Sequence, residues 1–259
     1  MKISRENKTK LNITFSMVAL ALIALVTATF AWFTLSLSTK VNTIDMEVTA
    51  GSYLKIDTVD RGNDLDAYKT EVDNAMINAQ MRSGLGYTLD DVKLAPLTSA
   101  DGVFLYDQQR KPVDNKRKSF VEFDLYFIGS TAMDVYLTEE NSKVGEDDGT
   151  HVSTKETGAK AKVVECARIS FEPEGQEGQI YEPKKNNATT LTVLGAGTQK
   201  TFTEAATGNN DARLFSLEAE RVKKVTVRVW IEGDDEPDCN DDVIKATFAA
   251  RLRFEGVEQ

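Results

Sequence analysis

The sequence predicts a mainly β protein, an antiparallel β-sandwich with one or two short inserted helices, preceded by an apolar N-terminal helix. Apolar and polar residues alternate in several separate stretches, as in strands that bury one face and expose the other. Only two short stretches show helical spacing instead. The N-terminal helix is expected from an uncharged run over residues 11–39.

The N-terminal run has the composition of an export signal or a membrane anchor. Lys2, Arg5, Lys8 and Lys10 stand in front of it, and a basic start followed by an apolar stretch is typical of both. We therefore divide the chain into a basic cytoplasmic region (1–10), a signal peptide or anchor (11–37) and an extracellular β-sandwich domain (38–259). The expected location is secreted or at the cell surface.

Two fates of this run stay open. The dense apolar segment Met17–Val26 has the length of a removable signal, which predicts cleavage in the region of Ala31, Trp32 and Phe33. The whole uncharged run is also long enough to span a hydrocarbon layer of ~30 Å, with Trp32 and Phe33 at the interface. The expected partners are a signal peptidase in the first case and the membrane, through residues 11–37, in the second.

Alternating residues mark the predicted strands. The clearest stretches are 44–49 (followed, after Gly51, by Leu54 and Ile56), 121–127, 133–137, 163–171, 225–231 and 248–254, with weaker ones at 103–106 and 189–194. Gly129 and Ser130 separate the second stretch from the third, so we interpret 120–137 as two strands paired with each other. Helical spacing predicts an inserted helix over about 66–81 and a shorter one over 214–220.

Composition excludes several classes of function. The formal net charge of −10 disfavours nucleic acid as a partner, because an acidic body repels phosphate backbones. The single histidine, His151, excludes the two-histidine zinc motif of metalloproteases. No glycine-rich phosphate loop stands between a strand and a helix. We therefore expect neither catalysis nor an organic cofactor.

Two further features leave alternatives open. An acidic loop contains Asp234, Asp235, Asp238 and Asp241, whose carboxylates suit calcium or simply face solvent. The two cysteines, Cys166 and Cys239, pair in an oxidising exterior or remain separate thiols.

Three stretches together carry a resemblance to a known group: 28–34 (ATFAWFT), 120–127 (FVEFDLYF), and 229–233 (VWIEG) leading into 236–239 (EPDC). The chain resembles exported proteins of Gram-positive bacteria whose signal peptides are cut by a SipW-type peptidase. That group includes the biofilm-matrix protein TasA, camelysin and clostridial surface proteins. The bulky Trp32 at the expected cut departs from the usual preference for small residues.

The resemblance implies a jelly-roll-like β-sandwich in the biofilm matrix or on the cell surface. It also implies fibres formed when the segment with Ile44, Met46 and Val48 adds as a strand to a neighbouring copy. The alternative is that this segment is the first strand of its own domain. Camelysin-like members are classed as metallopeptidases, but no recognisable zinc motif is present here. A secreted module that binds a glycan or calcium through its long loops remains the rival function.

Overall fold

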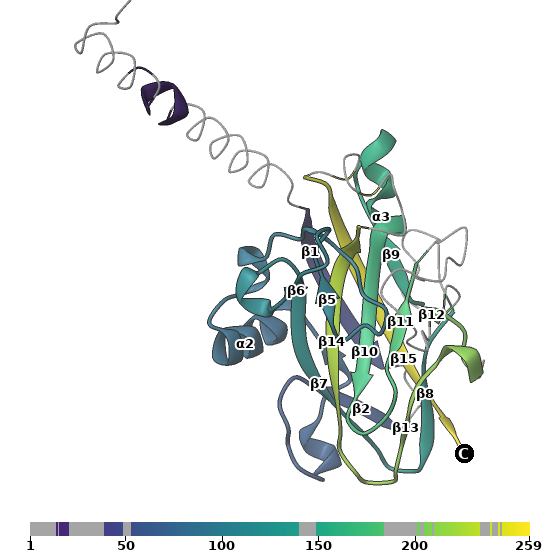
Figure 1. The fold of residues 1–259 in the computed structure, drawn as a ribbon. Helices are drawn as coiled ribbons and strands as arrows, with labels where there is room; N and C mark the ends of the chain where they lie inside the picture. Colours follow the sequence, from purple (N-terminus) through teal and green to yellow (C-terminus); the bar gives the residue numbers. More distant parts are fainter. Residues whose placement is uncertain are drawn as a thin grey trace, which may run out of the picture. The chain divides into compact units, whose positions relative to one another are not determined.

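The fold is described from a computed structural model of the 259-residue chain. The structure describes residues 14, 16–20, 39–48, 53–139, 149–183, 201–202, 205–208, 210–233, 239, 243 and 245–259. The chain divides into two units, Met1–Ser38 and Thr39–Gln259. The second unit holds all the strands described below (Figure 1).

One sheet has six strands in the order β13-β8-β15-β1-β3, with β9 also paired to β15. The first and last strands of the domain lie side by side and run parallel, whereas the other pairs are antiparallel. The bounds are β1 Lys40–Val48, β3 Glu71–Val72, β8 Met133–Leu137, β9 His151–Ser153, β13 Arg213–Leu217 and β15 Thr247–Glu258.

The other large sheet has seven strands in the order β12-β11-β10-β14-β7-β2, with β4 also paired to β14. Its bounds are β2 Leu54–Asp57, β4 Pro96–Leu97, β7 Val121–Gly129, β10 Ala167–Pro173, β11 Gln179–Tyr181, β12 Thr201–Phe202 and β14 Lys223–Glu232. A small third sheet pairs β5 (Leu105–Tyr106) with β6 (Pro112–Val113). The α-helices among the described residues of this unit are α2 (Asn74–Leu85) and α3 (Val163–Cys166).

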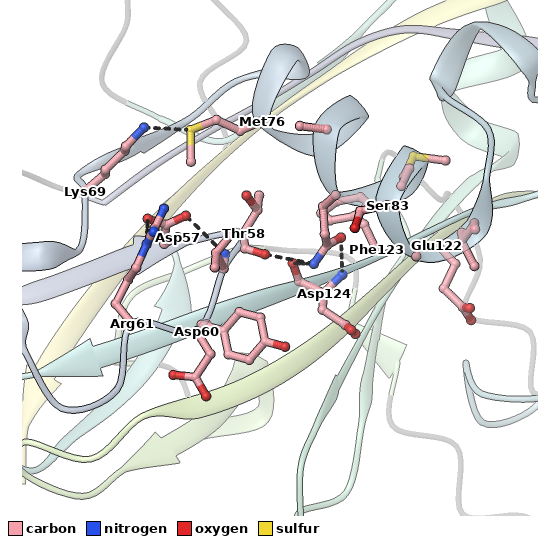
Figure 2. Close-up of a pocket in the computed structure, with 17 residues that line it drawn as sticks. Asp57, Thr58, Asp60, Arg61, Lys69, Met76, Ser83, Glu122, Phe123 and Asp124 are labelled. Carbon is pink, nitrogen blue, oxygen red and sulfur yellow. Dashed lines mark hydrogen bonds and ion pairs between the residues drawn. The ribbon is translucent and has the colours of Figure 1, made fainter.

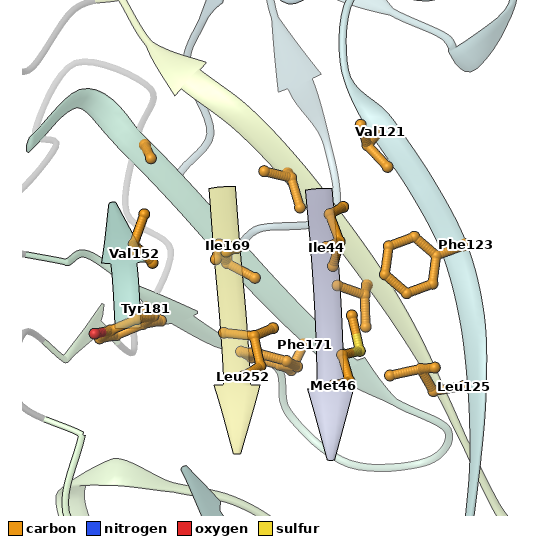
Figure 3. Packing of buried hydrophobic residues seen from close by; sticks show 14 of the residues in the cluster. Ile44, Met46, Val121, Phe123, Leu125, Val152, Ile169, Phe171, Tyr181 and Leu252 are labelled. Atoms are coloured by element: carbon orange, nitrogen blue, oxygen red, sulfur yellow. The ribbon is translucent and has the colours of Figure 1, made fainter. Parts of the chain in front are cut away.

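The two large sheets share one hydrophobic core. Ile44 and Met46 of β1 belong to the same buried cluster as Phe123 and Leu125 of β7 in the opposite sheet (Figure 3). Phe254 of β15 lies with its ring centroid 5.1 Å from that of Phe127 and 5.9 Å from that of Phe171. Because strand residues alternate between faces, this single cluster accounts for the alternation in both sheets.

A smaller apolar cluster lies apart from this core. Trp230 points away from the inward-facing neighbours Val229 and Ile231 on β14, and it packs with residues of the segment that contains β5 and β6. Its members are Leu97, Leu105, Val113, Phe120, Ile180 and Trp230. The segment after β4 thereby covers part of the outer face of the seven-stranded sheet.

The mainly β prediction is confirmed, and the strands predicted at 121–127, 225–231 and 248–254 are β7, β14 and β15. The prediction that 120–137 forms a paired unit is wrong. β7 pairs with β14 and β2, whereas β8 pairs with β15 and β13 in the other sheet. The turn after Gly129 therefore carries the chain across the core instead of closing a hairpin.

The predicted helices are corrected in two ways. The helix expected over 66–81 begins only at Asn74, because the Asp73 side chain accepts the Met76 N–H as an N-cap, and it ends before Gly86, which has φ +77°. The helix predicted over 214–220 is wrong, because Leu214, Phe215 and Leu217 lie in strand β13 and are buried.

The remaining predictions are resolved in part. The strand expected from residue 163 begins at Ala167, after the short helix α3. The weaker strand at 103–106 is β5, and the one at 189–194 lies outside the described residues. The stretches 107–118, 141–160 and 172–188, where no strand is predicted, contain the short strands β6, β9 and β11.

Candidate functional site

The first strand occupies a place within its own domain. Ile44, Met46 and Val48 of β1 are all buried in the shared core. Their register against β15 pairs Ile44 with Ala250 and Met46 with Leu252. The structure therefore shows the segment proposed for strand addition as the first strand of this domain.

Short contacts hold β1 on its other side. Met46 pairs with Val72 of β3. At the start of the domain, the Thr39 N–H donates to the Leu94 carbonyl (3.0 Å), and the Thr39 carbonyl accepts from the Leu94 N–H (2.8 Å). The Thr39 hydroxyl also donates to the carbonyl of Val243 (2.7 Å). Three hydrogen bonds thus hold Thr39, the first residue of the domain, in place.

The two cysteines form a disulfide, which decides between the two alternatives that the sequence leaves open. Cys166 ends α3, just before β10, and Cys239 lies in the connection between β14 and β15. Their Cα atoms are 5.7 Å apart, and both residues are buried in the shared core. The bond closes a loop with a sequence separation of 73 residues. Long loops of this kind constrain the unfolded chain strongly.

Several predicted site residues lie outside the described residues. They are Ala31, Trp32 and Phe33 of the cleavage region, and Asp234, Asp235, Asp238 and Asp241 of the acidic loop. Within the described part of the chain, no group of three or more histidine, cysteine or carboxylate residues is arranged to hold a metal ion. Among the same residues, no helix is both long enough and apolar enough to cross a membrane.

A cavity of about 570 Å³ lies between α2, β7 and the segment that follows β2 (Figure 2). Its polar lining includes Asp57, Arg61, Gln80 and Asp124, and Tyr126 adds an aromatic ring. None of these residues was singled out from the sequence. Asp124 and Tyr126 do stand at the polar positions of the alternating stretch 121–127. The sequence therefore predicts that they lie on the outer face of the sheet, but it does not predict that they line a cavity.

Charges around the cavity are largely balanced by neighbours. Asp57 is buried and forms an ion pair with Arg61, with 3.2 Å between Oδ2 and Nε. Asp124 pairs with Lys224 at 2.9 Å and accepts from the Thr226 hydroxyl at 2.7 Å. The hydrogen bond with Asp124 raises the pKa of Lys224 above its ordinary value. Asp57 and Asp124 are thus both engaged by neighbouring side chains.

Tyr126 is the aromatic group at this edge. Burial and the neighbouring Asp124 carboxylate raise the pKa of its phenol, so the ring remains neutral at physiological pH. The cavity has the size of a ligand pocket.

Neither the family models, nor the curated proteins, nor the solved structures contain a match to this chain. Its function is therefore argued from its own residues. Two features carry this argument. One is the position of β1 directly after the N-terminal run, and the other is the disulfide between Cys166 and Cys239 in the second half of the chain.

Proposed function

We propose that this chain is an exported structural protein of the cell surface or biofilm matrix, without a catalytic step. In this proposal its body is a jelly-roll-like β-sandwich, and copies assemble by exchanging β1. The observation that carries the proposal is the place of β1. It follows the uncharged run directly and fills a slot in the core beside the last strand.

Export is supported by two independent features. A basic start and an uncharged run of signal or anchor length are the usual requirements for leaving the cytoplasm. The buried Cys166–Cys239 disulfide suits an oxidising exterior, since cytosolic thiols are kept reduced. Together they favour an extracellular domain, either released by cleavage near Ala31 or held by residues 11–37.

Exchange of β1 is supported by the buried residues of β15 that β1 covers. If β1 left its own domain, it would uncover Ala250, Leu252 and Phe254 on β15, which are buried in the shared core. Only a strand with apolar residues at every second position can cover that gap and restore the main-chain hydrogen bonds. The β1 strand of a neighbouring copy meets both requirements, because it has the same sequence as the strand that it replaces. A chain of such exchanges produces an open filament.

Single cysteines placed on facing strands test this exchange. Thr43 on β1 pairs with Ala249 on β15, and both side chains lie outside the core. One chain with Thr43→Cys and another with Ala249→Cys are mixed under assembly conditions and oxidised. A disulfide between the two chains forms only where β1 of one copy lies beside β15 of another.

The controls separate exchange from random contact. A chain with both substitutions should close on itself, and this closure should abolish filaments in electron micrographs. Replacing Thr70 instead of Thr43 places the cysteine beside β3, and it should give no link between chains. Absence of the mixed disulfide in samples that contain filaments would exclude β1 exchange as the assembly mode.

A further inference from the structure

The outer face of the β1–β15 pair carries opposite charges on its two strands. Asp45 and Glu47 alternate with the buried residues of β1, and the parallel register places Arg251 and Arg253 opposite these two acids, in that order. Oε2 of Glu47 lies 2.8 Å from Nη1 of Arg253, and Oδ2 of Asp45 lies 3.8 Å from the same atom. Oδ2 of Asp45 also lies 3.8 Å from Nε of Arg251. The acids of β1 therefore face a basic strand.

Arg253 is the better shielded of the two arginines. Its side chain is 8% exposed, whereas that of Arg251 is 36% exposed. Solvent and salt weaken an ion pair less when it is shielded from water. Like charges directly opposite each other on neighbouring strands destabilise the pair. A strand with basic residues in place of the acids of β1 would therefore meet a guanidinium that water reaches poorly.

The opposite sheet pairs its charged strands in the same way. Glu122 of β7 forms an ion pair with Arg228 of β14, and Asp124 of β7 forms one with Lys224 of β14. In both sheets, an acidic strand thus lies beside a basic one. β7 already lies between β14 and β2, so its acidic face is engaged and is not free to take the place of β1.

We propose that Arg251 and Arg253 select the strand that lies beside β15, and that they accept a strand with acidic residues at two alternate outer positions. This inference rests on the proposed exchange of β1 and names the charge that the incoming strand must carry. Copies with a net charge of −10 repel each other, so their meeting requires a local attraction. β1 of a second copy supplies that attraction, because it carries Asp45 and Glu47 at the positions that face the two arginines.

Reversing the charges tests this selection. The donor variant carries Asp45→Lys and Glu47→Lys, and the acceptor variant carries Arg251→Glu and Arg253→Glu. Links between chains are read with the cysteine pair described above, one cysteine on the donating β1 and the other on the accepting β15. We expect the donor variant to link to an unsubstituted acceptor about tenfold less than an unsubstituted donor does. The acceptor variant should restore its link.

The matched control changes the net charge without touching the strand pair. Glu218→Lys with Glu220→Lys reverses two acids in an exposed turn, as the donor variant does on β1. This control should link to an unsubstituted acceptor at least as well as the unsubstituted chain does. If the donor variant also links as well as the unsubstituted chain, β1 exchange stands but selection by charge is wrong.

A single-chain measurement decides the selection without exchange. The donor variant should lose hydrogen-exchange protection at residues 40–48, and a chain with all four substitutions should regain it. If the acceptor variant proves unfolded by circular dichroism, Asp45→Lys and Arg251→Glu carry the same test at the more exposed pair. Unsubstituted chains that never link would exclude β1 exchange. Equal protection of residues 40–48 in the donor variant and the unsubstituted chain would overturn the selection itself.

Discussion

The two faces of the seven-stranded sheet are stabilised by different interactions. The inner face is apolar, with Val121 and Phe123 of β7 packed in the shared core. The outer face carries Arg228 of β14, whose guanidinium lies 2.6 Å from Glu122 on β7 and 2.7 Å from Glu172 on β10. One side chain therefore joins three neighbouring strands across the face that the core does not use.

The difference concerns how strongly each face depends on strand register. Apolar burial stabilises the fold in proportion to the area removed from water. It does not depend on the orientation of the groups that are buried. The ion pairs form only while Arg228 stands opposite Glu122, as the β7–β14 register places it. A slip by one residue would also move Arg228 into the core. We infer that the inner face supplies most of the stability and that the outer face favours the correct register.

The largest expected effect comes from the inner face. Phe254→Ala should lower the free energy of unfolding by ~3–5 kcal/mol, because it empties a site between Phe127 and Phe171. Denaturant titration measures the loss. Val257→Ala, at a partly exposed position of the same strand, should cost far less. Equal losses would show that the core is not centred on these rings.

A substitution on the outer face should cause a smaller loss of unfolding free energy, because it removes ion pairs and not apolar packing. Arg228→Met keeps the aliphatic stem but leaves Glu122 and Glu172 without their cation, at a cost of ~1–3 kcal/mol. Arg221→Met is the matched control, since its ion pair with Glu218 is exposed and should contribute less than ~1 kcal/mol. If the two variants lose the same stability, the proposed role of the outer-face ion pairs is wrong.

The smallest effect appears only at high pH. Tyr87 donates to the carbonyl of Asn115 (2.9 Å), and burial, with Glu122 and Asp114 nearby, raises its pKa to about 12. An unfolded phenol has a pKa of ~10, so the folded state favours the neutral form. This contribution is fully present below pH ~10 and is lost as the pH rises through about 12.

Tyr87→Phe tests this pH dependence, because its stability should fall less steeply than that of the wild type between pH ~10 and ~12. Unfolding free energies measured at intervals over that range give the two slopes. Tyr53→Phe, at an exposed position, serves as the control. Parallel curves for the wild type and Tyr87→Phe would contradict the expected dependence.

Local patterns predicted much of the strand content but not its pairing. Alternation located β7, β14 and β15, because one-sided burial leaves a period of two in the sequence. Which sheet a strand joins depends on contacts distant in sequence, so β8 was wrongly paired with β7. Gln80, whose side-chain amide bonds the backbone of Asp124 beside the cavity, carries no local signal, since a glutamine looks the same in the sequence whether or not it bonds a strand.

The parallel pairing of β1 with β15 has a consequence for the order of folding. Synthesis begins at the N-terminus, so β1 is made first and its long partner last. Until Thr247–Glu258 has been made, Ile44, Met46 and Val48 lack their long partner strand, and β1 can pair only with the two-residue strand β3 in the six-stranded sheet. Pairing between the ends of a chain is slow because a long loop must close first. Each newly made molecule therefore passes through an interval in which its first strand is available to another chain.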